Sequence, residues 1–265
     1  IALLFLMGVG PVIAWRRATP KHLWRAFAVP IGSGLVGAVV LRAAGVPFGY
    51  AHATFAIGVF VLGTIGQEFW RGMRVRQAML KESAPRALSR VVGKNRRRYG
   101  GYIVHIGIVC IFVGVAASSV FRIEVQQTLG EGQEMTAGKF RLRYEHISTQ
   151  EDGHMSRMAA VMSVWQGDQQ IATLEPEKRF YKKPQQPTTE VAMRSTLTED
   201  LYLVLGSFDP ESKLVTILAY VNPLVGWIWI GGLVLALGTL VAAWPTPAER
   251  RERVFAVSDV RVPVE

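Results

Sequence analysis

The sequence is poor in cysteine. Among its 265 residues only Cys110 is a cysteine, and it lies inside an apolar run. One cysteine excludes a disulfide within the chain, and there is no CxxC pair. We interpret Cys110 as a small buried hydrophobic side chain. The GxSxG, P-loop and HExxH patterns are also absent, so the sequence offers no independent hydrolase or ATPase site.

The first residues lack the features of a secretory signal peptide. There is no initiator methionine, no basic stretch ahead of the apolar one and no cleavage site of small residues. We therefore interpret residues 1–15 as the end of a membrane helix that begins in a longer polypeptide.

Apolar runs of membrane-spanning length are abundant. A helix needs about 20 apolar residues to cross the hydrocarbon of a bilayer. Such runs occupy 24–44, 49–69, 100–121 and 221–244. With the segment 1–15, they predict an α-helical polytopic membrane protein of about five spans, the first one truncated, with an inserted small antiparallel β domain.

Basic residues are concentrated on one side of this expected topology. Residues 70–98 contain ten Lys or Arg against the single acid Glu82, and residues 15–25 contain four with no acid. Segments of this kind next to membrane spans stay in the cytoplasm. Residues 122–220, with eleven basic and fourteen acidic residues, then lie on the outer face. Because membrane topology accounts for the net charge of +10, we expect no nucleic-acid partner.

The predicted organisation has six parts. Residues 70–99 are the basic cytoplasmic loop, in which 70–94 form either an amphipathic helix on the inner leaflet, broken at Pro85, or a solvated loop. The order along the chain is three membrane helices (1–69), this loop (70–99), a membrane helix (100–121), an outer β domain (122–220), the last membrane helix (221–244) and a cytoplasmic tail (245–265).

The outer region has the periodicity of β structure. Polar and apolar residues alternate over 139–147, 159–176, 201–208 and 213–221, and Gly-Asp at 167–168 marks a turn. This pattern predicts hairpins in a small antiparallel sheet or a barrel-like domain.

His105 is an ionisable residue inside an apolar segment, "NRRRYGGYIVHIGIV" (95–109). It lies about 7–8 Å along the helix from Gly100, and a residue at this depth is by default a functional hypothesis. Its candidate roles are proton relay, interhelical hydrogen bond and metal or haem ligand. Gly101 lies on the same face, one turn earlier, and leaves room for a flat macrocycle. Arg96, Arg97 and Arg98 lie near the headgroups, where they are placed to pair with propionates.

Three glycines at seven-residue spacing lie on the other face of the same segment. Gly100, Gly107 and Gly114 form a stripe of small residues that favours close helix packing. One face of this helix is therefore expected to pack and the other to hold a ligand. From the residues alone, a structural interhelical bond and a cofactor ligand remain equally supported roles for His105.

The segment "NRRRYGGYIVHIGIVCIFVGVAASSVF" (95–121) resembles the C-terminal part of the CcmF/NrfE family, the haem-lyase subunits of bacterial cytochrome c maturation. Further stretches agree in the same order: "LLFLMGVGPVIAWRRA" (3–18), "LEPEKRFY" (174–181), "TTEVAM" (188–193), "DLYLVLG" (200–206) and "YVNPLVGWIWIGGLVLALG" (220–238). The resemblance covers nearly the whole chain.

The resemblance implies a multi-pass protein of the bacterial inner membrane with residues 122–220 in the periplasm. The implied activity is covalent attachment of haem to the CxxCH thiols of an apocytochrome c. The implied partners are a periplasmic haem chaperone and apocytochrome-handling subunits, with quinol as an electron source. An intramembrane haem b would reduce the incoming haem. His105 matches one of its two axial ligands, and Gly101, Arg97 and Arg98 would line the same site.

Several features of the family are missing from this stretch. The tryptophan-rich haem-handling segment, its flanking histidines and the second haem b ligand would all precede residue 1. We therefore expect this chain alone to lack haem-lyase activity. The alternatives are a non-catalytic scaffold of an assembly complex that binds no haem and, less well supported, a transporter component, although neither internal repeats nor discontinuous helices are evident.

Overall fold

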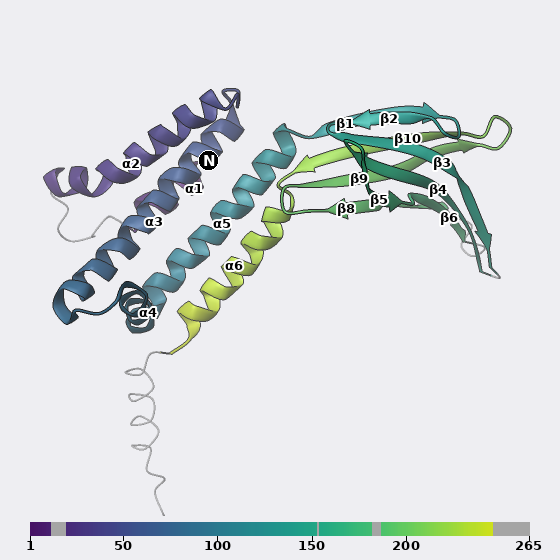
Figure 1. The fold of residues 1–265 in the computed structure, drawn as a ribbon. Coiled ribbons are helices and arrows are strands. Elements are labelled where there is room, and N and C mark those ends of the chain that lie inside the picture. Colours follow the sequence, from purple (N-terminus) through teal and green to yellow (C-terminus); the bar gives the residue numbers. More distant parts are fainter. Residues whose placement is uncertain (12–19, 153, 182–186, 246–265) are drawn as a thin grey trace, which may run out of the picture. The chain divides into compact units, whose positions relative to one another are not determined.

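The computed structural model describes residues 1–11, 20–152, 154–181 and 187–245. These residues form two compact units, one made of Ile1–Ala116 with Trp227–Glu265 and the other of Ala117–Gly226. The first unit is helical and the second is built of strands (Figure 1). The helices are α1 (Ala2–Val9), α2 (Pro20–Ala43), α3 (Tyr50–Leu80), α4 (Ala84–Lys94), α5 (Arg96–Val120) and α6 (Gly226–Ala243).

Four helices in the described part of the chain, α2, α3, α5 and α6, are long and apolar enough to cross a membrane. They correspond to the four complete spans expected from the sequence, and the fold class of a polytopic membrane protein with a β domain is confirmed. The expected first span (1–15) begins with α1, and residues 12–15 of it lie outside the described residues. The tail expected at 245–265 is described only at Pro245.

The sequence left two alternatives for residues 70–94, an amphipathic helix broken at Pro85 and a solvated loop, and the structure has helix over most of this stretch. Helix α3 continues eleven residues past the predicted end of its span and stops at Leu80, where Lys81 takes a left-handed conformation with φ of 51°. Pro85 lies in the first turn of α4 and does not break a helix. Proline suits this position because the first turn has no use for its missing N–H. Helix α6 also begins later than expected, at Gly226, because the preceding strand extends to Pro223.

The helical unit is held by a hydrophobic core shared among α1, α3, α4 and α5. Its buried members are Leu4, Phe60, Val61, Ile65, Val91, Tyr99, Tyr102 and Val109. Helix α1 packs closely on α3, since a Cβ added to Gly8 would come within 2.3 Å of the Phe60 ring. Only a glycine permits this contact.

The strand unit consists of two antiparallel sheets. One has the order β1-β10-β9-β8, and the other has the order β2-β3-β4-β6-β7 with β5 paired to β4. The strands are β1 (Ile123–Leu129), β2 (Glu134–Ala137), β3 (Phe140–Glu151), β4 (Met155–Gln166), β5 (Gln169–Leu174), β6 (Glu177–Tyr181), β7 (Pro187–Glu190), β8 (Ala192–Ser195), β9 (Glu199–Asp209) and β10 (Leu214–Pro223).

The two sheets pack face to face around one core. Alternate residues of β9 and β10, such as Leu203 and Ile217, are fully buried together with Leu142 and Met162 of the other sheet. The fold is therefore a β-sandwich and not a barrel. The expected turn at Gly167-Asp168 joins β4 to β5, and Gly167 has the positive φ of 60° that such a turn requires.

Candidate functional site

His105 lies within α5, about 14 Å along the axis from the start of the helix. Its Nδ1 atom is buried and has no hydrogen-bond partner among the described residues. An unsatisfied buried polar atom costs about 1–3 kcal/mol. Such an atom in a membrane-length helix supports a functional role for His105 more strongly than a structural interhelical bond, since Nδ1 makes no such bond within the described part of the chain.

A pocket of about 590 Å³ opens beside this histidine. Its walls come from two segments: Leu3, Leu6, Met7, Gly10 and Pro11 at the start of the chain, and Arg98, Gly101, Tyr102 and His105 of α5. The volume lies within the range of small-molecule pockets. The wall supplied by the α1 segment was not anticipated from the sequence, because it depends on how α1 packs against the other helices.

Gly101 occupies the position that the sequence suggested, one turn before His105 in the wall of the pocket. No neighbouring heavy atom lies within 4 Å of a Cβ added to it, so the space in front of it is open. The imidazole and the glycine therefore border one open, mostly apolar space.

The two arginines that were predicted as site residues separate in the structure. Arg98 lines the pocket, whereas Arg97 is not among its lining residues. The cause is helical geometry, since consecutive residues point about 100° apart. The placement therefore supports Arg98, and not Arg97, as a neighbour of a ligand in this pocket.

Arg98 already has two partners within the protein. Its Nε donates a 2.7 Å hydrogen bond to the Tyr102 hydroxyl, and its Nη2 forms an ion pair with Glu68 of α3. The other carboxylate oxygen of Glu68 is 3.3 Å from Nη1 of Arg71. Glu68 is buried with only 8% of its surface exposed.

Glu68 and Tyr102 were missed as site residues. A lone carboxylate near the end of an apolar run is a signal that could have identified Glu68. Its partner could not have been identified in this way, because Arg98 lies thirty residues further along the chain.

The opposite face of α5 packs against α6, as the glycine stripe predicted. A Cβ on Gly107 would lie 2.6 Å from the carbonyl oxygen of Gly231, and one on Gly100 would lie 2.8 Å from the Cα of Ala242. Such approach of two backbones requires small residues on both helices. This contact occupies the face of α5 opposite Gly101 and His105.

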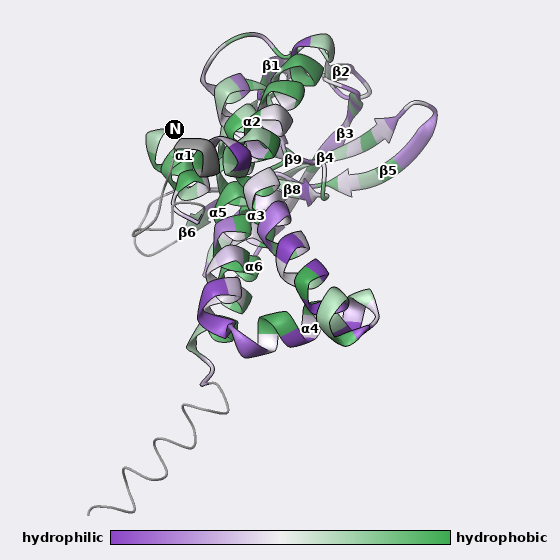
Figure 2. Ribbon diagram, turned by 90° about the vertical axis from the view of Figure 1, so that its left-hand side faces the viewer, coloured by the Kyte–Doolittle hydropathy of each residue, from purple (hydrophilic) through white to green (hydrophobic). Residues whose placement is uncertain are grey.

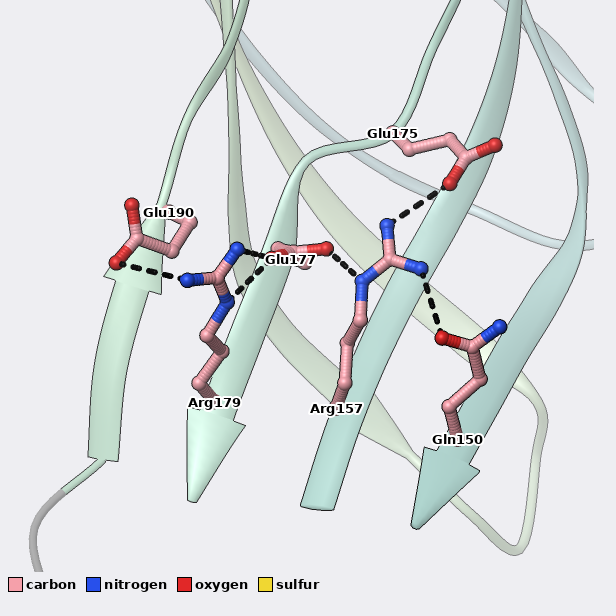
Figure 3. A network of polar contacts seen from close by, with 6 residues as sticks. All are labelled: Gln150, Arg157, Glu175, Glu177, Arg179 and Glu190. Carbon is pink, nitrogen blue, oxygen red and sulfur yellow. Dashed lines mark hydrogen bonds and ion pairs between the residues drawn. The ribbon is translucent and has the colours of Figure 1, made fainter. Parts of the chain in front are cut away.

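The β-sandwich has a second concentration of charged groups around Glu177, drawn in Figure 3. Glu177 is 4% exposed and accepts hydrogen bonds from Arg157 of β4 and from Arg179 of its own strand, the latter at 2.6 Å. Arg157 also donates to Glu175 at 3.0 Å and to Gln150 at 3.4 Å.

Electrostatics keeps this carboxylate ionised. Burial acts to raise the pKa of Glu177, but the hydrogen bonds and charges of Arg157 and Arg179 outweigh it, so that the pKa lies below its usual value. Gln150, Arg157 and Arg179 come from neighbouring strands of the same sheet, and Glu175 lies just before β6, so the network joins β3, β4 and β6. This geometry supports a structural role for the "PEKRFY" segment (176–181).

Comparison with known proteins agrees with this architecture. Residues 120–223 match the family described as the CcmF C-terminal beta-sandwich. The chain is 30% identical over 260 residues to the cytochrome c-type biogenesis protein CcmF of Pseudomonas fluorescens, covering 98% of this chain and 37% of that protein. It is 31% identical over 157 residues to the Escherichia coli protein named "Probable cytochrome c-type biogenesis protein NrfE", covering 59% of this chain and 28% of that one.

The fold also matches a solved structure. The cytochrome c heme lyase CcmF superposes with a TM-score of 0.67 at 23% identity, over 92% of this chain and 38% of that chain. The chain therefore spans well under half the length of the relatives it matches. The sandwich topology, the membrane helices and the ordered similarity agree: residues 120–223 belong to the family of the CcmF C-terminal β-sandwich, and the chain resembles CcmF and NrfE proteins over most of its length.

Proposed function

We propose that this chain is part of a cytochrome c maturation protein and that His105 would hold the iron of a haem b within the membrane. The relatives at 30–31% identity are named as cytochrome c-type biogenesis proteins, and the solved structure is titled a heme lyase. The observation that carries the assignment to a residue is the unpartnered His105 at the edge of an open, mostly apolar pocket.

The residues around the pocket fit a haem. A neutral imidazole binds haem iron, apolar side chains suit the macrocycle, and Gly101 leaves the space before the histidine free. When bound, a haem b supplies an iron that carries one electron. His105 would hold and orient that iron, and Leu6 and Met7 would exclude water from it. Arg98 would provide positive charge at the pocket for the propionates, although it also serves Glu68.

The remaining parts of the proposal follow from family membership. The β-sandwich lies in the periplasm of a bacterium, and the helices lie in its inner membrane. Haem would pass from a periplasmic haem chaperone to the CxxCH motif of an apocytochrome c held by partner subunits, and the electrons would come from quinol. A second ligand of the haem iron would be supplied by residues outside this chain.

Absorption spectra of the purified full-length protein test the ligand. His105→Ala should remove the haem b bands from the reduced-minus-oxidised spectrum, while His146→Ala, in the β-sandwich, should keep them. Bands that persist in His105→Ala would overturn the ligand assignment and favour a scaffold that binds no haem at this histidine.

A second pair of variants tests the pocket and not the ligand. Gly101→Leu should fill the space before His105 and reduce haem occupancy, measured as haem per protein. Gly66→Leu is the matched control, because a Cβ on Gly66 of α3 also meets no atom within 4 Å but lies outside the pocket. Equal occupancy in the two variants would place the haem elsewhere.

A further inference from the structure

A second pocket, of about 550 Å³, lies between α3, α4 and α5. Four of its lining residues are basic: Arg71 and Arg76 of α3, Lys94 at the end of α4 and Arg98 of α5. The only acidic residue among its lining residues is Glu68. The wall of this pocket is therefore mostly cationic on its polar side.

The ion pairs around this pocket leave positive charge unmatched. Arg71 and Arg98 both form ion pairs with Glu68. Glu82 forms ion pairs with Nε of Arg76 at 2.7 Å and with Nη1 of Arg90 at 2.6 Å. The hydrogen bond and charge of Arg76 hold the pKa of Glu82 below its usual value, so Glu82 is already committed to its own arginines. Lys94 forms no ion pair with any described residue, so one lysine in the wall is free to meet an anion.

The other side of the pocket is apolar and open to the surroundings. Val75, Met79 and Leu80 line it, and their surfaces are 60%, 76% and 56% exposed. In Figure 2 hydrophilic and hydrophobic residues alternate along this end of α3 and along α4. Cations beside exposed aliphatic side chains match a molecule with an anionic head and an apolar body, and not a simple inorganic ion.

The length of α3 places this pocket at the level of lipid headgroups. A helix of 31 residues is about 46 Å long, whereas the hydrocarbon of a bilayer is about 30 Å thick. The excess of roughly ten residues agrees with the part of α3 that lines the pocket, from Glu68 to Leu80.

We propose that this pocket is a binding site for an anionic phospholipid. Lys94 and Arg71 contact the headgroup phosphate, and the acyl chains lie along Val75 and Met79. Basic pockets between membrane helices recognise lipids in this way, and each lysine or arginine near the surface contributes about 1 kcal/mol. The lipid would brace α4 against α3 and α5. This inference depends on the chain spanning a membrane and not on haem binding at His105.

The test is a lipid titration of the full chain in neutral detergent micelles, followed by native mass spectrometry. Phosphatidylglycerol should bind as one saturable molecule, and phosphatidylcholine should bind much more weakly. Lys94→Gln should weaken the binding of phosphatidylglycerol about fivefold, which corresponds to the loss of one cationic contact. Lys94→Arg should restore it.

The matched control is Lys81→Gln, which removes one charge from the same basic region at a residue that does not line the pocket. It should leave the affinity unchanged. Lys94 and Lys81 are both exposed, so neither substitution disturbs a core. Equal losses of phosphatidylglycerol affinity in the two variants would show that surface charge alone attracts the lipid. Equal binding of phosphatidylglycerol and phosphatidylcholine would show that the headgroup is not recognised. Binding of glycerol 1-phosphate as tightly as the lipid would show a site for free phosphate. Each of these results overturns the proposal.

Discussion

Arg98 of α5 forms an ion pair with Glu68 of α3, and the same guanidinium donates a hydrogen bond to Tyr102 one turn further along α5. Tyr102 in turn donates to Glu68 at 3.4 Å. This triad joins α3 and α5. It lies between the pocket at His105 and the basic pocket between α3, α4 and α5, since Arg98 lines both pockets.

Loss of the buried carboxylate should weaken the helical unit. In Glu68→Gln, Arg71 and Arg98 lose their shared anion, and the expected destabilisation is about 1–3 kcal/mol. The value stays below that of a fully buried pair because the Arg98 side chain is 56% exposed. Thermal unfolding in detergent measures the effect. Glu124→Gln, which removes an exposed ion pair with Arg122, is the control and should change stability by less than about 1 kcal/mol.

The contact between α5 and α6 should not tolerate a side chain. Gly107→Ala would place a methyl group 2.6 Å from the Gly231 carbonyl oxygen, and the expected cost of overpacking is about 1–3 kcal/mol. Gly101→Ala on the same helix meets open space and should cause no loss. The thermal unfolding midpoints of the two variants measure this difference. Similar midpoints for both would contradict the close packing of α5 against α6.

The Glu177 network should make the β-sandwich sensitive to acid. Because its folded pKa is lowered, Glu177 contributes stability that is fully present above its unfolded pKa, about 4.3, and is lost as the pH falls through the lower folded value. Glu177→Gln should therefore be less stable than the parent protein at pH 7, and the difference should shrink below about pH 4.

The thermal midpoint of the β-sheet amide I infrared band follows this unit in the intact protein. Glu211→Gln, at an exposed residue in the turn between β9 and β10, is the control and should match the parent protein throughout. A stability gap for Glu177→Gln that stays constant from pH 7 to pH 3 would argue against an ionised Glu177.

The proposed topology places the β-sandwich and the basic loop on opposite sides of the membrane. In a background with Cys110→Ala, an impermeant maleimide should label Asp168→Cys, in the turn between β4 and β5, from the periplasmic side of intact cells. Lys81→Cys should react only after the membrane is opened. The reverse pattern would place the β-sandwich in the cytoplasm.

Local periodicity was sufficient for much of the helical unit. Apolar runs of spanning length located α2, α3, α5 and α6, because a helix in lipid must satisfy its own backbone. The 3.6-residue period placed Gly101 beside His105 and placed Gly107 on the packing face. In the β-sandwich, alternation located β3, β4, β5, β9 and β10, whereas the four-residue strands β2, β7 and β8 are too short to show a period.

The sequence thus determined the properties that repeat along one element: the length of each membrane span, the residues that share a helix face and the distribution of charge. The pocket at His105 depends on Leu6 and Met7, nearly one hundred residues earlier in the chain, and the Glu68–Arg98 pair joins two separate helices. No local pattern encodes such pairings, because they arise when helices pack and bring distant side chains to the same depth. Tertiary packing therefore supplied the partners of each site residue, while the residue types and their spacing had already indicated which helix would carry the site.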